Sequence, residues 1–139
     1  MIVETAPLTW DELEHWLQID LSAMDALIRA AVPSAQTRPG SNSSRAWVLH
    51  CYRVYTPAPG TDIDPVVVGI SISRPDGAGA YTVRADIAGE TLGDVLVELP
   101  PRRAASQLEA GRVARLLGEE LLRHADAVIR ALRDETRRA

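Results

Sequence analysis

Several residue types and patterns are scarce or missing in this 139-residue chain. Its single cysteine can form no internal disulfide, and a zinc site of four cysteines is excluded for the same reason. No apolar run approaches the ~20 residues that cross a bilayer. The first residues, MIVETAPLTWDELEHW, lack the basic start and apolar stretch of a secretory signal. We therefore expect a cytoplasmic protein that does not interact with a membrane.

Lysine and phenylalanine are absent as well, so all 15 basic residues are arginine, and the formal net charge is −4. Residues 1–101 hold 13 acids and 6 arginines, whereas residues 102–139 hold 6 acids and 9 arginines. Nucleic-acid binding needs a concentrated basic face, and here the C-terminal arginines are interleaved with acids. We therefore expect no nucleic-acid partner. The length fits a single domain over residues 1–139.

The first apolar pattern of the chain is helical. Thr9 stands three residues before Glu12, which is the spacing of a capping box, and apolar residues then recur at helical intervals up to Ala31. Asp20 interrupts this stripe. We therefore predict an N-terminal helix that is either bent or divided into two short helices near residues 19–21.

The last part of the chain has the same helical periodicity. Ser106 and Glu109 again have the spacing of a capping box, and the pattern predicts a long helix from Arg103 or Ser106 to near Arg137. Several arginine and acidic residues lie four apart on its polar side, which is typical of a solvated helix face. Residues 133–139 are expected to fray.

Between the helical segments the chain alternates with a period of two, the pattern of half-buried strands. The expected strands are 46–55, 65–73, 80–88 and 94–99. Short connections join them, so we predict a four-stranded antiparallel meander. Residues 33–45, PSAQTRPGSNSSR, contain almost nothing apolar and are expected to form an exposed loop. The predicted fold is a two-layer α+β domain with both terminal helical segments on one face of the sheet.

The only cysteine, Cys51, directly follows His50, which raises the question of a reactive pair. Successive side chains of a strand point to opposite faces, so these two side chains cannot reach one another. We expect Cys51 to be a small buried hydrophobic residue and His50 to be partly buried and held by a hydrogen bond. No other motif identifies a reaction, and we predict no catalytic residue and no cofactor.

Two other histidines have a carboxylate on the same side of a helix. His15 follows Asp11 by four residues, and His124 follows Glu120 by four. Two ligands without a third do not make a metal site. We therefore predict no metal.

The strand 46–55, AWVLHCYRVY, is apolar on both faces, although the predicted helices cover only one face of the sheet. A large exposed apolar surface usually marks an interaction site. Its cover could be the loop 33–45, a second copy of the chain or a foreign protein. The predicted interaction residues are Trp47, Leu49, Tyr52, Tyr55 and Leu96.

These patterns favour a non-enzymatic protein-binding module, such as a small acidic adaptor, chaperone or neutralising partner, and we expect a homodimer. The alternative is a small-molecule-binding protein or an enzyme. Its pocket would lie between the sheet and the C-terminal helix, with Trp16, His50, Tyr52 or Tyr81 as lining residues. A structural domain of a larger assembly is the third possibility.

Overall fold

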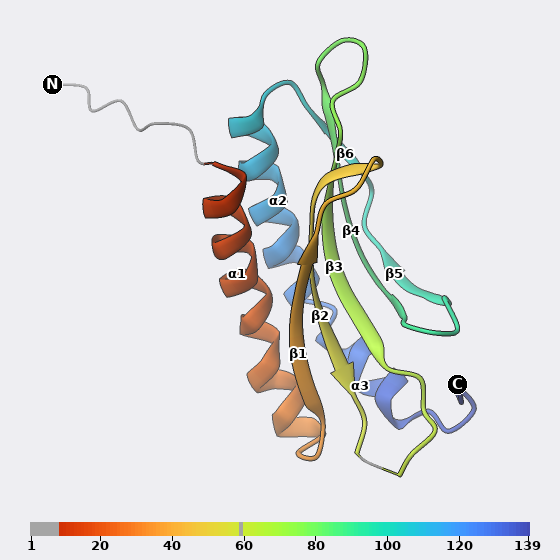
Figure 1. Cartoon of the computed structure of the whole chain (residues 1–139). Coiled ribbons are helices and arrows are strands. Elements are labelled where there is room, and N and C mark those ends of the chain that lie inside the picture. The colour runs from red at the N-terminus through yellow and green to blue at the C-terminus, as the bar shows by residue number, and fades with distance from the viewer. Residues whose placement is uncertain (1–8, 59) are drawn as a thin grey trace, which may run out of the picture.

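The computed structural model of the chain describes residues 9–58 and 60–139, so the first eight residues of the predicted domain 1–139 lie outside the described ones. Figure 1 shows two layers, a curved sheet and a layer of helices along one of its faces. The elements in chain order are α1 Trp10–Ala31, β1 Gln36–Asn42, β2 Trp47–Thr56, β3 Val66–Ser73, β4 Tyr81–Gly89, β5 Val95–Glu98, β6 Arg102–Ala104, α2 Gln107–Leu122 and α3 Ala125–Arg133.

The sheet is an antiparallel meander, as predicted, but it has six strands where four were expected. The spatial order is β1-β2-β3-β4-β5, and the short strand β6 pairs with the other half of β4. The predicted fourth strand is shortened to β5. Strand β6 consists of RRA, which is too short and too polar to show alternation.

The prediction of an exposed loop at 33–45 was wrong, because Gln36–Asn42 form the edge strand β1, which pairs with His50–Thr56 of β2. This strand contributes no apolar side chain to the core. It is held by the ladder to β2 and by α1, since Gln18 Nε2 donates a hydrogen bond of 2.7 Å to the carbonyl of Gly40. A strand is recognised in a sequence by alternating apolar side chains, and β1 has no buried side chain to produce that alternation.

Helix α1 is one continuous helix of 22 residues, so of the two predicted alternatives the division into two short helices near Asp20 is not found. The capping box is confirmed at its start, where the Glu12 amide donates to Thr9 Oγ1 at 3.1 Å. The polar residue in the stripe has a partner on another helix: Asp20 Oδ2 accepts from Arg115 Nε at 3.0 Å. The stripe is therefore interrupted by an interhelical ion pair and not by a turn.

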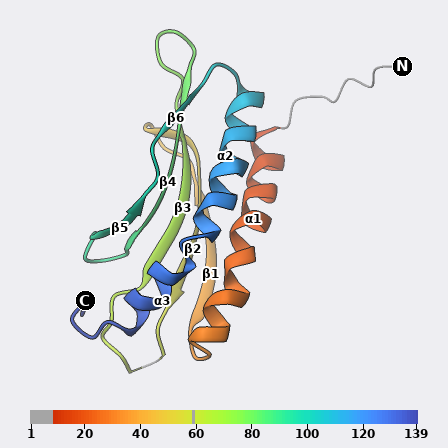
Figure 2. The ribbon, with the colours of Figure 1, turned by 180° about the vertical axis from the view of Figure 1, so that it is seen from behind.

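Helices α1 and α2 lie side by side in the helix layer (Figures 1 and 2). Glycines on α2 permit this close approach. A Cβ at Gly111 would lie 3.5 Å from Leu13 Cδ1, and one at Gly118 would lie 3.5 Å from Asp20 Cβ. Both distances are ordinary contacts, so a Cβ alone would fit, whereas side chains larger than alanine at these positions would push the helices apart.

The predicted long C-terminal helix is divided into α2 and α3. Ser106 caps α2 as expected, with the Glu109 amide donating to its hydroxyl at 3.1 Å. The helix ends at Leu122, where the amides of Arg123 and His124 bond to carbonyls three residues back. This turn redirects α3 across the lower end of the sheet, where Val128 and Leu132 are buried (Figure 1).

The C-terminal tail does not fray as predicted. Arg137 is 8% exposed, and its guanidinium donates two hydrogen bonds to the Asp94 carboxylate, Nε to Oδ2 at 2.7 Å and Nη2 to Oδ1 at 2.9 Å. Its Nη2 also lies 3.8 Å from Oδ2 of Asp64, a carboxylate with no exposed surface. The backbones of the same two residues are also bonded, because the Asp64 amide donates to the Arg137 carbonyl at 2.7 Å. Arg137 thus holds the C-terminal tail against the segments that precede β3 and β5.

Removing this arginine should destabilise the protein strongly. In Arg137→Ala the buried Asp64 loses its cation, and we expect the free energy of unfolding to fall by about 3 kcal/mol. The neighbouring Arg138 has an exposed side chain, so Arg138→Ala should change it by less than about 0.5 kcal/mol. Urea denaturation of both variants measures the difference. Equal stabilities would contradict the assigned role.

The same contact predicts a dependence on pH. Hydrogen bonds from Arg137 lower the pKa of Asp94 in the folded state. The stabilisation is therefore fully present above the ordinary aspartate value of about 4 and is lost as the pH falls through the lower folded value. Denaturation curves below pH 4 should show a smaller acid-side loss in Arg137→Ala than in the unmodified protein.

Candidate functional site

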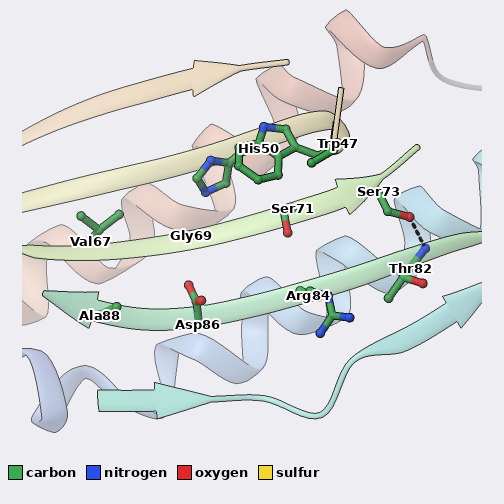
Figure 3. Close-up of a pocket in the computed structure, with 11 residues that line it drawn as sticks. Trp47, His50, Val67, Gly69, Ser71, Ser73, Thr82, Arg84, Asp86 and Ala88 are labelled. Atoms are coloured by element: carbon green, nitrogen blue, oxygen red, sulfur yellow. Dashed lines mark hydrogen bonds between the residues drawn. The ribbon is translucent and has the colours of Figure 1, made fainter. Parts of the chain in front are cut away.

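The face of the sheet opposite the helices, here called the outer face, carries a groove of about 500 Å³. It lies over the central strand β3, with β2 on one side and β4 on the other (Figure 3). We call it the outer groove. Its lining residues are Ala46, Trp47 and His50 from the β2 side, Val67, Gly69, Ser71 and Ser73 from β3, and Thr82, Arg84, Asp86 and Ala88 from β4.

A bulge in β2 places Trp47 in this groove. Trp47 pairs with Ser73 and Leu49 with Ile72, so the register shifts by one residue between them. The alternation expected from the sequence therefore fails at this point. Trp47 does not share the face of Leu49, and its ring lies 5.2 Å from the ring of His50. Its Nε1 donates a hydrogen bond of 2.7 Å to Asn42 Oδ1, which fixes the indole at the rim.

Three rings follow one another along the outer side of β2. The rings of His50 and Tyr52 lie 5.1 Å apart, next to the Trp47 contact. The Tyr52 ring covers Gly40 of β1, where a Cβ would come within 2.3 Å of the ring carbons. Only glycine fits beneath this ring. Trp47 and His50 thus form an aromatic wall along one side of the groove, and Tyr52 extends the row of rings over β1.

Gly69 leaves a gap in the floor between β2 and β4. It pairs with Tyr52 on one side and Asp86 on the other, and all three positions face outward. A Cβ at position 69 would lie 3.0 Å from His50 Nε2. The absence of a side chain therefore gives His50 its position and opens a space between strands whose backbones are about 10 Å apart.

One polar side chain of the groove has a partner on the next strand, because the Thr82 amide donates to Ser73 Oγ at 2.8 Å (Figure 3). His50 Nδ1 is buried and has no hydrogen-bond partner within residues 9–58 and 60–139, so the hydrogen bond expected for this histidine is not found at that atom. Burial lowers the pKa of His50, which keeps the imidazole neutral at pH 7. Across the floor, Ser71 lies between His50 and Arg84 in the ladder.

Asp86 supplies a carboxylate to the same floor. Although this side chain reaches solvent, its partial burial in the groove raises its pKa, and the neighbouring Glu98 carboxylate raises it further. The imidazole of His50, the guanidinium of Arg84 and the carboxylate of Asp86 therefore all line the same groove (Figure 3). Such a set can accept and donate hydrogen bonds to a peptide or a polar ligand.

The sheet curls toward the outer face at the opposite end from Trp47. Arg38 on β1 forms an ion pair of 3.2 Å with Glu90 at the end of β4, although β2 and β3 lie between these strands. Val54 lies in the row of Arg38 on this face and is only 2% exposed. This pair therefore bounds the groove at one end.

The structure separates the five predicted interaction residues. Trp47 and Tyr52 lie on the outer face, as described above. Leu49 and Tyr55 point to the helices and are 5% and 1% exposed, and the Tyr55 hydroxyl donates to Asp25 Oδ1 at 2.6 Å. Leu96 lines a hollow with α3, because a bulge between Ile87 and Ala88 shifts the register of β5. These three are not on the open face of this chain.

Cys51 has no exposed surface, and burial raises the pKa of its thiol to about 12. It faces the helices, opposite to His50, so the two neighbours do not form a reactive pair. Within the described residues, no three histidine, cysteine or acidic side chains come together as a metal site. Likewise, no described helix is both long and apolar enough to cross a membrane.

Sequence reasoning did not identify Arg84, Asp86 and Ser71 as groove residues. They were polar members of alternating strands, which usually face solvent. The signal that could have identified them is Gly69, because a glycine in the middle of a central strand rich in valine and isoleucine often marks a close approach or a ligand. The chain matches no protein-family model, and comparisons with curated proteins and with solved structures gave no match either.

The environment of His50 can be measured directly. Because burial disfavours its charged form, we expect an NMR titration of the imidazole to give a pKa below the ordinary value of about 6.5. Folding should lose stability as the pH falls below that value, since the unfolded chain takes up the proton first. The resonance is assigned by its loss in His50→Gln. A midpoint at or above 6.5 would show that the ring is in water.

Proposed function

We propose that the protein is a non-enzymatic binding module that holds an extended segment of another protein in the outer groove. The observation that carries this proposal is the groove itself, a hollow bordered by Trp47 and His50 on the face of the sheet opposite the described helices. Aromatic side chains and arginine are the residue types that contribute most to protein interfaces. Trp47, Tyr52 and Arg84 are all at this face.

The length of the groove fits an extended peptide. Its floor runs along β3 from Val67 to Ser73, which corresponds to about 20 Å of strand. An extended segment of about six residues covers that distance. Its apolar side chains would pack on the rings of β2, and its polar groups would pair with His50 Nδ1 and the side chains of β4.

A partner is expected on the face of the sheet and not on its edges. At the β1 edge, Pro39 has no amide hydrogen, and the carbonyl of Gly40 already accepts from Gln18. On the other side, β5 and β6 have only 4 and 3 residues. Short or blocked edges disfavour the addition of a strand.

We assign no catalytic role to the groove. A general base needs a partner that orients its ring, and His50 Nδ1 has none among the described residues. The second candidate function is binding of a small molecule at the same place, because about 500 Å³ falls within the usual range of ligand sites. The site first expected for it, between the sheet and the C-terminal helix, is filled by Ile70, Leu117 and Leu121, which are at most 1% exposed.

Selection of peptides from a random phage-displayed library tests the proposal. We expect enriched peptides whose affinity falls at least about tenfold in Trp47→Ala, the loss typical of an aromatic anchor. Gly69→Val should reduce binding similarly, because the added side chain fills the floor and displaces His50. Calorimetric titration of the selected peptides gives the affinities.

The control is Leu92→Ala, which truncates a residue that is 47% exposed and lies in the turn after β4, outside the groove. Its affinity for the peptides should equal that of the unmodified protein. The proposal is contradicted if no peptide is enriched, or if the enriched peptides bind the two groove variants as well as the control.

A further inference from the structure

Helix α1 has a second apolar side that no other helix or strand of the described residues buries, although the Arg115 guanidinium of α2 lies over the Trp16 ring at 5.0 Å. Besides the buried stripe that packs on the sheet, it exposes residues at spacings of three and four along its outer side. Trp16, Ile19 and Leu27 are 40%, 45% and 46% exposed. We call this set the outer α1 stripe: Trp16, Ile19, Ala23, Ala26, Leu27 and Ala30.

A helix that is apolar on two opposite sides is normally buried on both. The neighbouring helix adds to the exposed surface of the same layer, since Leu108 and Leu116 of α2 are 44% and 49% exposed. Five of the seven large apolar side chains that are most exposed in the described residues therefore lie on α1 or α2. Such a concentration marks an interaction surface and not scattered exposure.

From this surface we infer that the occupant of the outer α1 stripe is a second copy of the chain, packed with its α1 antiparallel around a two-fold axis near Ala23. The stripe is self-complementary in shape under this symmetry. Trp16 of one copy then faces Ala30 of the other, and Ile19 faces Leu27. Trp16 thereby packs on an alanine, Ile19 and Leu27 form an apolar pair on each side of the axis, and the alanine at the axis lets the helices approach to about 8 Å.

The charges of the helix are complementary under the same symmetry. The first turn of α1 carries Asp11 and Glu12, and its last turn carries Arg29. A second arginine lies at that end, because Arg133 of α3 donates to the carbonyl of Ala31. An antiparallel arrangement places the acidic end of each helix beside the basic end of the other. A parallel arrangement would place like charges together.

This surface is separate from the outer groove, because the helix layer and the groove lie on opposite faces of the sheet (Figures 2 and 3). A dimer formed through α1 leaves both grooves open. The inference therefore does not depend on the proposed function, and each can fail without the other.

The mass of the full chain in solution tests the inference. Light scattering should give twice the 15.1 kDa of the chain. Ala23→Glu should give the monomer, because two like charges would meet at the axis, while circular dichroism should show an unchanged fold, since glutamate suits an exposed helix position. The matched control is Val67→Glu in the outer groove, which should leave the dimer intact.

A covalent test checks the register. Ala23→Cys should form a disulfide-linked dimer without reductant, because residues on the axis come within bonding reach. Leu92→Cys, at an exposed position far from the stripe, should not. The native Cys51 is fully buried and does not interfere. A monomeric unmodified protein, a dimer that survives Ala23→Glu, or a dimer lost only in Val67→Glu would each overturn the inference.

Discussion

The pairing of β2 with β3 and of β3 with β4 decides which side chains meet the helices and which meet solvent. The antiparallel register determines, for each side chain of these strands, which of the two faces of the sheet it lies on. Val66, Val68 and Ile70 thereby join the core beneath the helices, and Val67 and Gly69 face the other way. The buried core and the open groove are consequences of the same register.

Two bulges modify this register at the ends of the outer face. The bulge in β2 turns Trp47 outward, and the bulge in β5, where Leu96 is the extra residue opposite Ile87 and Ala88, places Leu96 beside α3. At the far end, the Arg38–Glu90 ion pair closes the curl of the sheet. The floor of the groove is therefore formed by regularly paired strands, and its ends are set by a bulge and an ion pair. Bulges are common where a sheet carries a binding site.

Alternation and capping signals were sufficient to predict the α+β class, the starts of α1 and α2, and the inward position of Cys51. They could not predict β1, because that strand is held by backbone bonds and by Gln18 and buries no apolar side chain. The ordered tail was missed for another reason. Arg137 and Asp94 are 43 residues apart, and a single sequence does not show that they meet. The positions of Trp47 and Leu96 could not be predicted either, because a bulge leaves no signal in the alternation.

Two surfaces are not covered by any other part of the chain that the structure describes: the outer groove, bordered by Trp47 and His50, and the outer side of the helix layer around α1. Whether the outer face is open in solution is measured most directly by broadening of valine methyl resonances with a soluble paramagnetic probe. We expect the Val67 methyls to broaden strongly and those of Val66 and Val68, at most 1% exposed, to remain sharp. Equal protection of all three valines would contradict an open face and the function proposed for it.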